Sequence, residues 1–149
     1  MTDRPDWDHY FMQIAQVVEK RGTCVRPGRK VGAVLTADRR IIATGYNGVA
    51  SGLPHCTPET CQRTVLNIPS GERMELCRAI HAEINCLLQA ARYGARTAGS
   101  TLYVTVYPCS ACMRALYQAG VVRVVYDRPY PGQGYDDFGE RMIIERRQP

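Results

Sequence analysis

The sequence predicts an α/β fold with a mixed β-sheet, antiparallel at one edge and parallel at the other, and flanked by helices. Residues 31–46 form two short apolar runs separated by a turn, a pattern typical of an antiparallel hairpin. Residues 101–126 give a strand, a short helix and a second strand, a crossover unit whose strands are parallel. A chain of 149 residues favours one domain, spanning 1–149.

The N-terminal third predicts one helix followed by the hairpin. Residues 6–21 carry apolar side chains at helical spacing and end at Arg21-Gly22. Residues 31–36 and 40–46 are the two strands, and residues 37–39 are the turn.

The middle of the chain predicts a long irregular segment and a second helix. Residues 47–78 contain many turn-forming residues and no clear period, and a loop of this length in a compact domain usually has a function or binds a metal. Residues 79–93 predict a helix, and Gly94 is a suitable cap for its end.

The C-terminal part predicts the parallel edge of the sheet. Residues 101–106 and 121–126 are its strands and residues 109–119 are the helix between them, closed by Gly120. A turn-rich loop at 129–134 and a short helix at 136–146 complete the prediction. The helices at 79–93 and 109–119 should begin near each other, at the end of the parallel strands where such sheets bind their ligands.

The charge of the chain favours an anionic small molecule as ligand. The net charge is +5, and 17 of the 19 basic residues are arginine, whose planar fork suits phosphate. Because the arginines are scattered and form no run, a phosphorylated small molecule fits at least as well as a nucleic-acid duplex.

The apolar and cysteine content indicates a cytoplasmic protein. No apolar run approaches the roughly 18 residues of a membrane span, and the N-terminus lacks an apolar signal core. Seven cysteines are many for a chain of this length, and metal ligation in a reducing compartment explains them better than a disulfide scaffold.

Two short motifs carry the chemistry: His81-Ala82-Glu83 and Pro108-Cys109-Ser110-Ala111-Cys112. One imidazole and two thiols can hold zinc with three protein ligands and leave a fourth position for water, as catalytic zinc sites do. Thiols at a helix N-terminus favour the thiolate form that zinc needs. The carboxylate of Glu83 is a suitable group to move protons to and from that water.

Each motif alone has a simpler interpretation. Cys109 and Cys112 could be a redox pair or half of a structural zinc knuckle, His81 an ordinary helix histidine, and Glu83 a solvated charge. The two motifs in this order, each at a helix start, favour the metal site and match the pattern H-x-E…P-C-x-x-C of zinc nucleobase deaminases.

The chain therefore resembles the cytidine deaminase-like superfamily, and within it the deoxycytidylate (dCMP) deaminases, from about residue 7 to residue 131. The resemblance implies a three-layer fold and zinc-dependent hydrolysis of dCMP to dUMP and ammonia, which supplies the precursor of thymidylate. The resemblance rests on the motifs Lys30-Val31-Gly32-Ala33-Val34, Gly45-Tyr46-Asn47-Gly48, Cys77 to Glu83, Thr101 to Thr105 with Pro108 to Cys112, and Ala119-Gly120-Val121 leading to Val124-Val125-Tyr126.

The family pattern implies roles for five residues at the catalytic centre. It implies that His81, Cys109 and Cys112 hold zinc and that Glu83 shuttles protons between water, the ring N3 and the leaving amine. Asn47 is similar to the residue that reaches the sugar or base of the bound nucleotide, and the backbone of Ala82 normally contacts the base.

Two further sets of residues are candidates for binding roles. Arg26, Arg29, Lys30 and Arg78 flank the predicted site and could hold the phosphate, although each could equally be a solvated charge. Tyr126 and Tyr130 follow a strand end and could cover the base, with core packing favoured for Tyr126.

Four cysteines outside the catalytic motifs suggest a second, structural zinc. Cys24, Cys56, Cys61 and Cys77 could pin the irregular segment, and relatives in the dCMP branch carry a structural zinc near this place. His55 could replace one thiol, and the alternative is that these are small buried residues.

The resemblance also implies properties of the assembly, and the chain departs from the family at three places. Many relatives are hexamers activated by dCTP and restrained by dTTP, so a homo-oligomer is expected, and Arg92 could face a neighbouring subunit. Ala50 replaces a frequent proline, Val106-Tyr107 replaces a pair such as His-Phe, and the chain is expected to lack a final edge strand.

Two other functions remain open at this point. A tRNA adenosine deaminase, or another nucleoside deaminase, shares the zinc motifs, but the cysteine-bearing segment argues against the first and His81 against the free-nucleoside branch, which usually has cysteine there. A zinc-stabilised nucleic-acid-binding module without catalysis would have no use for Glu83.

Overall fold

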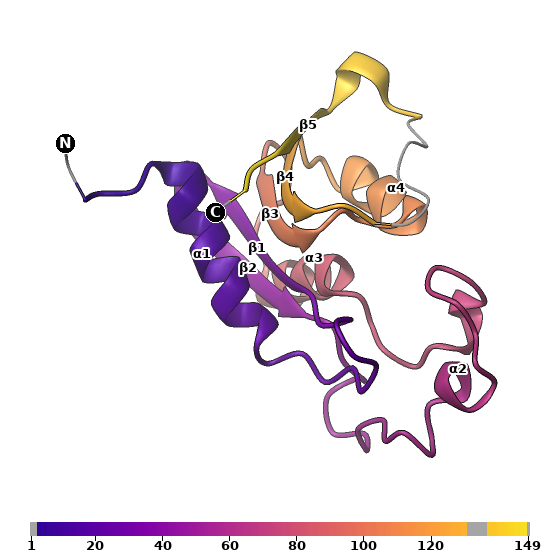
Figure 1. Cartoon of the computed structure of the whole chain (residues 1–149). Helices are drawn as coiled ribbons and strands as arrows, with labels where there is room; N and C mark the ends of the chain where they lie inside the picture. Colours follow the sequence, from indigo (N-terminus) through magenta and orange to yellow (C-terminus); the bar gives the residue numbers. More distant parts are fainter. Residues whose placement is uncertain (1–2, 131–136, 149) are drawn as a thin grey trace.

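The computed structural model describes residues 3–130 and 137–148. Five strands form one mixed sheet in the order β2-β1-β3-β4-β5 (Figure 1). β1 pairs antiparallel with β2 and with β3, whereas β3 with β4 and β4 with β5 are parallel, so the predicted mixed sheet is confirmed. The strands are β1 (Gly32–Ala37), β2 (Arg40–Tyr46), β3 (Thr101–Val106), β4 (Arg123–Arg128) and β5 (Ile143–Arg146).

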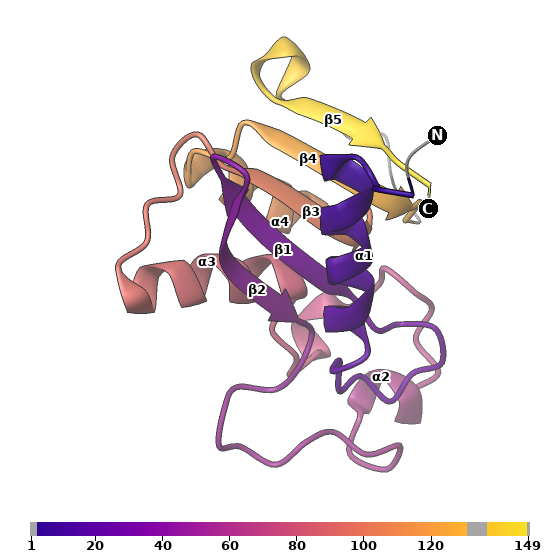
Figure 2. The ribbon, with the colours of Figure 1, turned by 90° about the vertical axis from the view of Figure 1, so that its left-hand side faces the viewer.

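Helices cover both faces of the sheet and give three layers. Helix α1 (Trp7–Glu19) lies on one face, and α3 (Ala82–Tyr93) and α4 (Ser110–Gln118) lie on the other (Figure 2). The described part of the irregular segment contains only the short helix α2 (Gln62–Val65) and the 3-10 turn η1 (Met74–Leu76). None of the helices in the described ranges is long and apolar enough to cross a membrane.

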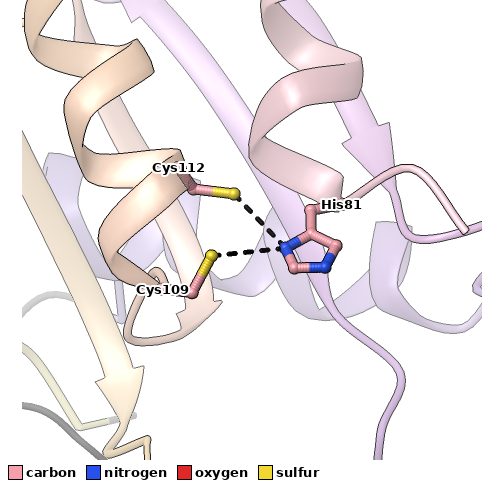
Figure 3. Close-up of side chains that lie close together, drawn as sticks. All are labelled: His81, Cys109 and Cys112. Atoms are coloured by element: carbon pink, nitrogen blue, oxygen red, sulfur yellow. Dashed lines mark hydrogen bonds between the residues drawn. The ribbon is translucent and has the colours of Figure 1, made fainter. Parts of the chain in front are cut away.

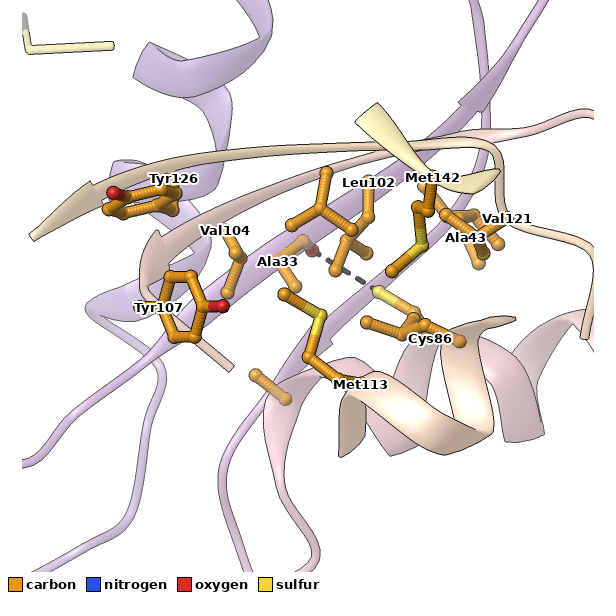
Figure 4. Packing of buried hydrophobic residues seen from close by; sticks show 14 of the residues in the cluster. Ala33, Ala43, Cys86, Leu102, Val104, Tyr107, Met113, Val121, Tyr126 and Met142 are labelled. Atoms are coloured by element: carbon orange, nitrogen blue, oxygen red, sulfur yellow. Dashed lines mark hydrogen bonds between the residues drawn. The ribbon is translucent and has the colours of Figure 1, made fainter. Parts of the chain in front are cut away.

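The core consists of two clusters separated by the sheet. Alternate residues of β1 point to opposite faces, so Val34 packs with Phe11 and Met12 of α1, whereas Ala33 and Leu35 face α3 and α4. The cluster on the α3 and α4 side of the sheet also contains Leu102, Val104, Met113 and Cys86 (Figure 4). It supports the N-termini of these two helices.

The hairpin between β1 and β2 closes as predicted, through a two-residue turn. Asp38 and Arg39 have φ values of 50° and 60°, and Ala37 pairs with Arg40. Positive φ at both central residues is the geometry that matches the twist of the flanking strands. Later in β2, a Cβ on Gly45 would lie 2.2 Å from the carbonyl oxygen of Ala82, so glycine permits the close approach of α3.

The second long helix begins three residues later than predicted. The prediction spans 79–93, but Ile80 is extended and exchanges two backbone hydrogen bonds with Gly48, of 3.1 and 2.8 Å. This bridge holds the start of the irregular segment beside the N-terminus of α3. Gly94 has φ 72° and caps the helix, as predicted.

The C-terminal prediction is wrong in two respects. A helix was expected over 136–146, and a final edge strand was expected to be missing, but β5 runs parallel to β4 at the sheet edge and follows the 3-10 turn η2 (Gly139–Arg141). Ile143 and Ile144 are β-branched, and the free edge of β4 selects the strand. Residues 131–134 of the predicted loop, together with 135 and 136, lie outside the described residues.

A charged network fastens α1 to the parallel edge of the sheet. The Asp8 carboxylate accepts two hydrogen bonds from Arg123, of 2.8 and 2.7 Å, and one of 2.9 Å from the Tyr103 hydroxyl. The hydrogen bond from Arg123 lowers the pKa of Asp8, against the opposing effect of burial. Arg123 also donates to Glu145 of β5 at 2.7 Å, so the network joins both ends of the chain.

We expect Asp8→Asn to lower the free energy of unfolding by about 2 kcal/mol, because a charge-assisted pair becomes a neutral one. Since the folded pKa of Asp8 lies below the ordinary 3.8, its contribution is present above that pH and is lost as pH falls through the folded value. Urea denaturation at about pH 7 and about pH 3 should show a smaller difference between wild type and variant at the lower pH. Asp38→Asn, on the hairpin turn, is the control, and equal loss in both variants would contradict the prediction.

Candidate active site

Two helix N-termini bring the predicted metal ligands together. His81 is the N-cap of α3 and Cys109 is the N-cap of α4, both in extended conformation, with ψ 151° and 163°. Cys112 lies one turn into α4 and is buried. As α3 and α4 pack on the same face of the sheet, the two sequence motifs meet at one end of it (Figure 3).

The three ligand atoms have the spacing that zinc requires. Nδ1 of His81 lies 3.3 Å from Sγ of Cys112 and 3.6 Å from Sγ of Cys109 (Figure 3). Tetrahedral zinc, with bonds of about 2.3 Å to sulfur and about 2.0 Å to nitrogen, separates such atoms by about 3.6 Å. Within residues 3–130 and 137–148 no other His, Cys, Asp or Glu joins this group, so three protein ligands leave a fourth position open.

The electrostatics of the group favour a bound cation. A hydrogen bond from the Cys112 thiol lowers the pKa of Cys109 to about 4, although burial opposes this. The hydrogen bond with Cys109 raises the pKa of His81. A thiolate is therefore present at neutral pH, and binding of a divalent cation would release the remaining protons.

Glu83 is placed to act on a molecule bound beside the metal ligands. It lies in the first turn of α3, is only 4% exposed, and lines the same cavity as His81 and Cys109. Burial raises the pKa of its carboxyl to about 7. A group with a pKa near neutrality can both accept and donate a proton, as a general acid–base catalyst must.

The cavity above the ligands collects most of the predicted binding residues. Asn47, Ala82 and Tyr130 line it, as do Val106 and Tyr107 at the end of β3. Tyr126 is buried and its ring packs edge-to-face against Tyr107, with 4.9 Å between centroids, in agreement with the core role favoured for it.

Asn47 is anchored to the chain through its side chain. Its Oδ1 accepts from the backbone of Val31 at 2.8 Å, and its Nδ2 donates to the carbonyl of Arg29 at 2.7 Å. The amide therefore holds the segment that leads into β1, and it keeps one donor and one acceptor position for a further partner.

The family of the chain follows from these features. The family model for the cytidine and deoxycytidylate deaminase zinc-binding region matches residues 5–128. The chain belongs to this deaminase family. The group formed by His81, Cys109 and Cys112 lies within the matched residues and could hold a metal ion.

Similar proteins support the assignment. The deoxycytidylate deaminase of Mycobacterium phage D29 is 42% identical over 84% of this chain and 97% of its own length. ComE operon protein 2 of Bacillus subtilis is 39% identical over 89% of this chain, which spans 65% of that protein. The dCMP deaminase of cyanophage S-TIM5, solved with dCMP and dUMP, superposes with TM-score 0.78 and 28% identity, over 98% of this chain and 100% of that one.

The predicted phosphate ligands of this deaminase are divided by the structure. Arg26 and Arg29 line the cavity, whereas Lys30 and Arg78 are exposed, and Arg78 donates to the carbonyl of Pro54 at 3.4 Å. Arg63 was not predicted from the sequence, but it is 8% exposed and lines the same cavity. No motif or period marks Arg63, since it lies in the irregular segment.

The four cysteines outside the catalytic motifs gather around one smaller cavity. Cys24, Cys56, Cys61 and Cys77 all line it, and Cys24 and Cys77 also line the cavity that contains His81 and Glu83. No three of their sulfur atoms lie within 4.8 Å of one another, whereas the ligand atoms of His81, Cys109 and Cys112 do. His55 lies on a different groove, beside β2 and α3.

Proposed function

We propose that this chain catalyses the hydrolytic deamination of dCMP to dUMP and ammonia, which supplies the precursor of thymidylate. One observation supports the proposal above the others: His81 and Cys109 of the three-residue metal site, a buried carboxyl and arginine side chains line one cavity. Deaminases named for dCMP among the relatives, and the dCMP and dUMP complex of the S-TIM5 protein, agree with this substrate.

The residues of the chain account for the proton transfers of the reaction. Zinc, when bound at such a site, acts as a Lewis acid that makes water nucleophilic at neutral pH. Glu83 accepts one proton of the water that attacks C4 and delivers it to N3. It then transfers the proton of the new C4 hydroxyl to the exocyclic amine, so that the C4–N bond breaks, ammonia leaves and C4 becomes a carbonyl. Because its pKa is about 7, one carboxyl serves each step in turn.

Substrate binding is assigned to groups around the cavity. Asn47 offers its remaining donor and acceptor to the sugar or base, and the backbone at Ala82, the first residue of α3, has no intrahelical partner for its N–H and faces the base. Arg26 and Arg29 provide positive charge for the phosphate, and Tyr130 covers the base.

Ammonia release from three substrates tests the proposal: dCMP, deoxycytidine and an anticodon stem-loop. We expect dCMP to be turned over with the highest kcat/KM, because deoxycytidine offers no phosphate to the cavity arginines and the stem-loop offers an adenine in place of cytosine. Equal kcat/KM for deoxycytidine would contradict recognition of the phosphate. Turnover of the stem-loop alone would support the tRNA adenosine deaminase alternative. Zinc binding without turnover of any substrate would favour the non-catalytic nucleic-acid-binding module.

We also propose a second, structural zinc held by Cys24, Cys56, Cys61 and Cys77. Four thiols around one cavity support it, and a closed thiolate site would stabilise a segment that has little regular structure. Elemental analysis should find about two zinc ions per chain, and Cys61→Ser should reduce this to about one while dCMP turnover persists. A wild-type ratio of about one, or an unchanged ratio in Cys61→Ser, would contradict the second site.

We further propose a cytoplasmic homo-oligomer, a hexamer by resemblance, that responds to dCTP and dTTP. All seven cysteines are free thiols, which suits a reducing compartment. Leu53, Leu88 and Tyr93 are 55%, 50% and 74% exposed around one groove that also includes Arg92, and an interface between subunits would cover them. Sedimentation of the purified protein measures the number of subunits, and repeating it with dCTP shows whether this nucleotide changes the assembly.

A further inference from the structure

Arg63 is a buried cation that forms no ion pair with an acidic side chain of residues 3–130 and 137–148. It lies in α2, is 8% exposed, and lines the cavity that contains His81 and Glu83. Its Nε donates to the carbonyl of Glu72 at 3.1 Å and its Nη2 to the carbonyl of Pro69 at 3.3 Å. Among the described residues no carboxylate lies within ion-pair distance of it.

Arg26 lines the same cavity. Its Nη2 donates to the carbonyl of Ile68 at 2.6 Å, and its Nη1 is buried without a hydrogen-bond partner in the described structure. The two guanidinium groups are thus held by backbone carbonyls of one short segment, 68–72. Burying positive charge with neutral partners only is costly, and an anion that enters the cavity would relieve that cost.

The positive charge of Arg63 acts on Tyr130, which lines the same cavity. Burial raises the pKa of Tyr130, and the positive charges of Arg63 and Arg29 oppose that rise. Arg63 therefore lies within electrostatic reach of the residue assigned to the base, not on a separate surface.

We propose that Arg63 is a specificity-determining residue that binds the phosphate group of the substrate, with Arg26 as its partner. The inference rests on the proposed function, since it assumes a nucleoside monophosphate as substrate. Arginine forms paired hydrogen bonds to phosphate oxygens, and two pre-positioned guanidinium groups would balance a dianion. The carbonyls at 68–72 orient the guanidinium groups before the ligand arrives, which lowers the entropy lost on binding.

A purely structural role for Arg63 makes a different prediction. If its only task were to fasten the 68–72 segment, its loss would impair phosphorylated and unphosphorylated ligands alike. If Arg63 binds phosphate, its replacement lowers the affinity for the phosphorylated ligand only.

The test is the affinity for dUMP and for deoxyuridine, measured by calorimetry on the zinc-loaded protein. We expect Arg63→Met to weaken dUMP binding about 100-fold and to leave deoxyuridine binding unchanged. Arg96→Met removes an exposed arginine outside the cavity and should leave both affinities at the wild-type level. Unchanged dUMP binding in Arg63→Met, or an equal loss for both ligands, overturns the proposal.

A second variant covers the case in which Arg63→Met does not fold. Arg63→Lys keeps the charge but lacks the paired donors, so dUMP affinity should fall about tenfold at normal zinc content. Wild-type affinity in Arg63→Lys would overturn the proposal. Failure of the proposed function is seen separately, as wild-type protein that releases no ammonia from dCMP.

Discussion

Replacing Glu83 with glutamine is expected to lower kcat for dCMP about 10⁴-fold, while the zinc content and the affinity for dUMP stay at the wild-type level. The amide has nearly the size of the carboxyl but cannot accept and return a proton. General acid–base catalysis contributes about 10²–10⁴-fold, and the upper end applies here because the same group serves more than one transfer.

The fold should survive this substitution. Glu83 is buried and burial disfavours its charged form, so a neutral side chain of the same shape does not add a desolvation cost. The loss of turnover can therefore be assigned to proton transfer, not to unfolding, provided that circular dichroism and zinc content match wild type.

A matched control is available on η2. Glu140 is exposed in the described structure, so Glu140→Gln removes one carboxylate without touching the cavity and should leave kcat unchanged. Wild-type kcat in Glu83→Gln would contradict the role of Glu83, and loss of zinc from that variant would show that Glu83 supports the metal.

The proximity of the candidate catalytic residues could be predicted because these residues are marked by local sequence. His81 and Cys109 precede helices, and their spacing from Glu83 and Cys112 is set by one helical turn or less. The strands at 40–46 and 101–106 were located to the residue because each has a strong β-branched or alternating pattern between clear turns.

Arg63 could not be predicted for the opposite reason. It lies in a four-residue helix within a segment of no period, and only the tertiary placement of 68–72 turns an apparently solvated charge into a buried one. Arg29, by contrast, was a candidate because it flanks a predicted site segment, and it lines the cavity although its side chain is exposed.

The late start of α3 and the unpredicted strand β5 have long-range causes as well. The start of α3 is delayed to Ala82 because Ile80 pairs with Gly48, 32 positions earlier in the chain. The C-terminal strand β5 forms because β4 offers a free parallel edge, and Arg123 adds an ion pair to Glu145 there. A short run such as Ile143-Ile144 is compatible with either helix or strand until that partner is present.

Replacing Cys112 with serine is expected to remove the catalytic zinc and to abolish dCMP turnover. Cys112 is buried, and its Sγ lies 3.3 Å from the imidazole nitrogen that completes the ligand group. Serine stays protonated at neutral pH and provides no thiolate, so zinc affinity should fall by more than about 100-fold. Elemental analysis after dialysis should show about one zinc per chain less than wild type.

The control for this variant is Cys86→Ala. Cys86 is buried in α3 and its thiol donates to the carbonyl of Ala33 at 3.5 Å, away from the metal ligands. Its loss should cost about 1 kcal/mol of stability and leave zinc content and turnover intact. The core around α4 includes Met113 and Leu116, which Cys112→Ser does not change, so the variant should remain folded. If Cys112→Ser retained both zinc and turnover, the metal would have to be held elsewhere, and the open three-ligand site could not be the catalytic centre.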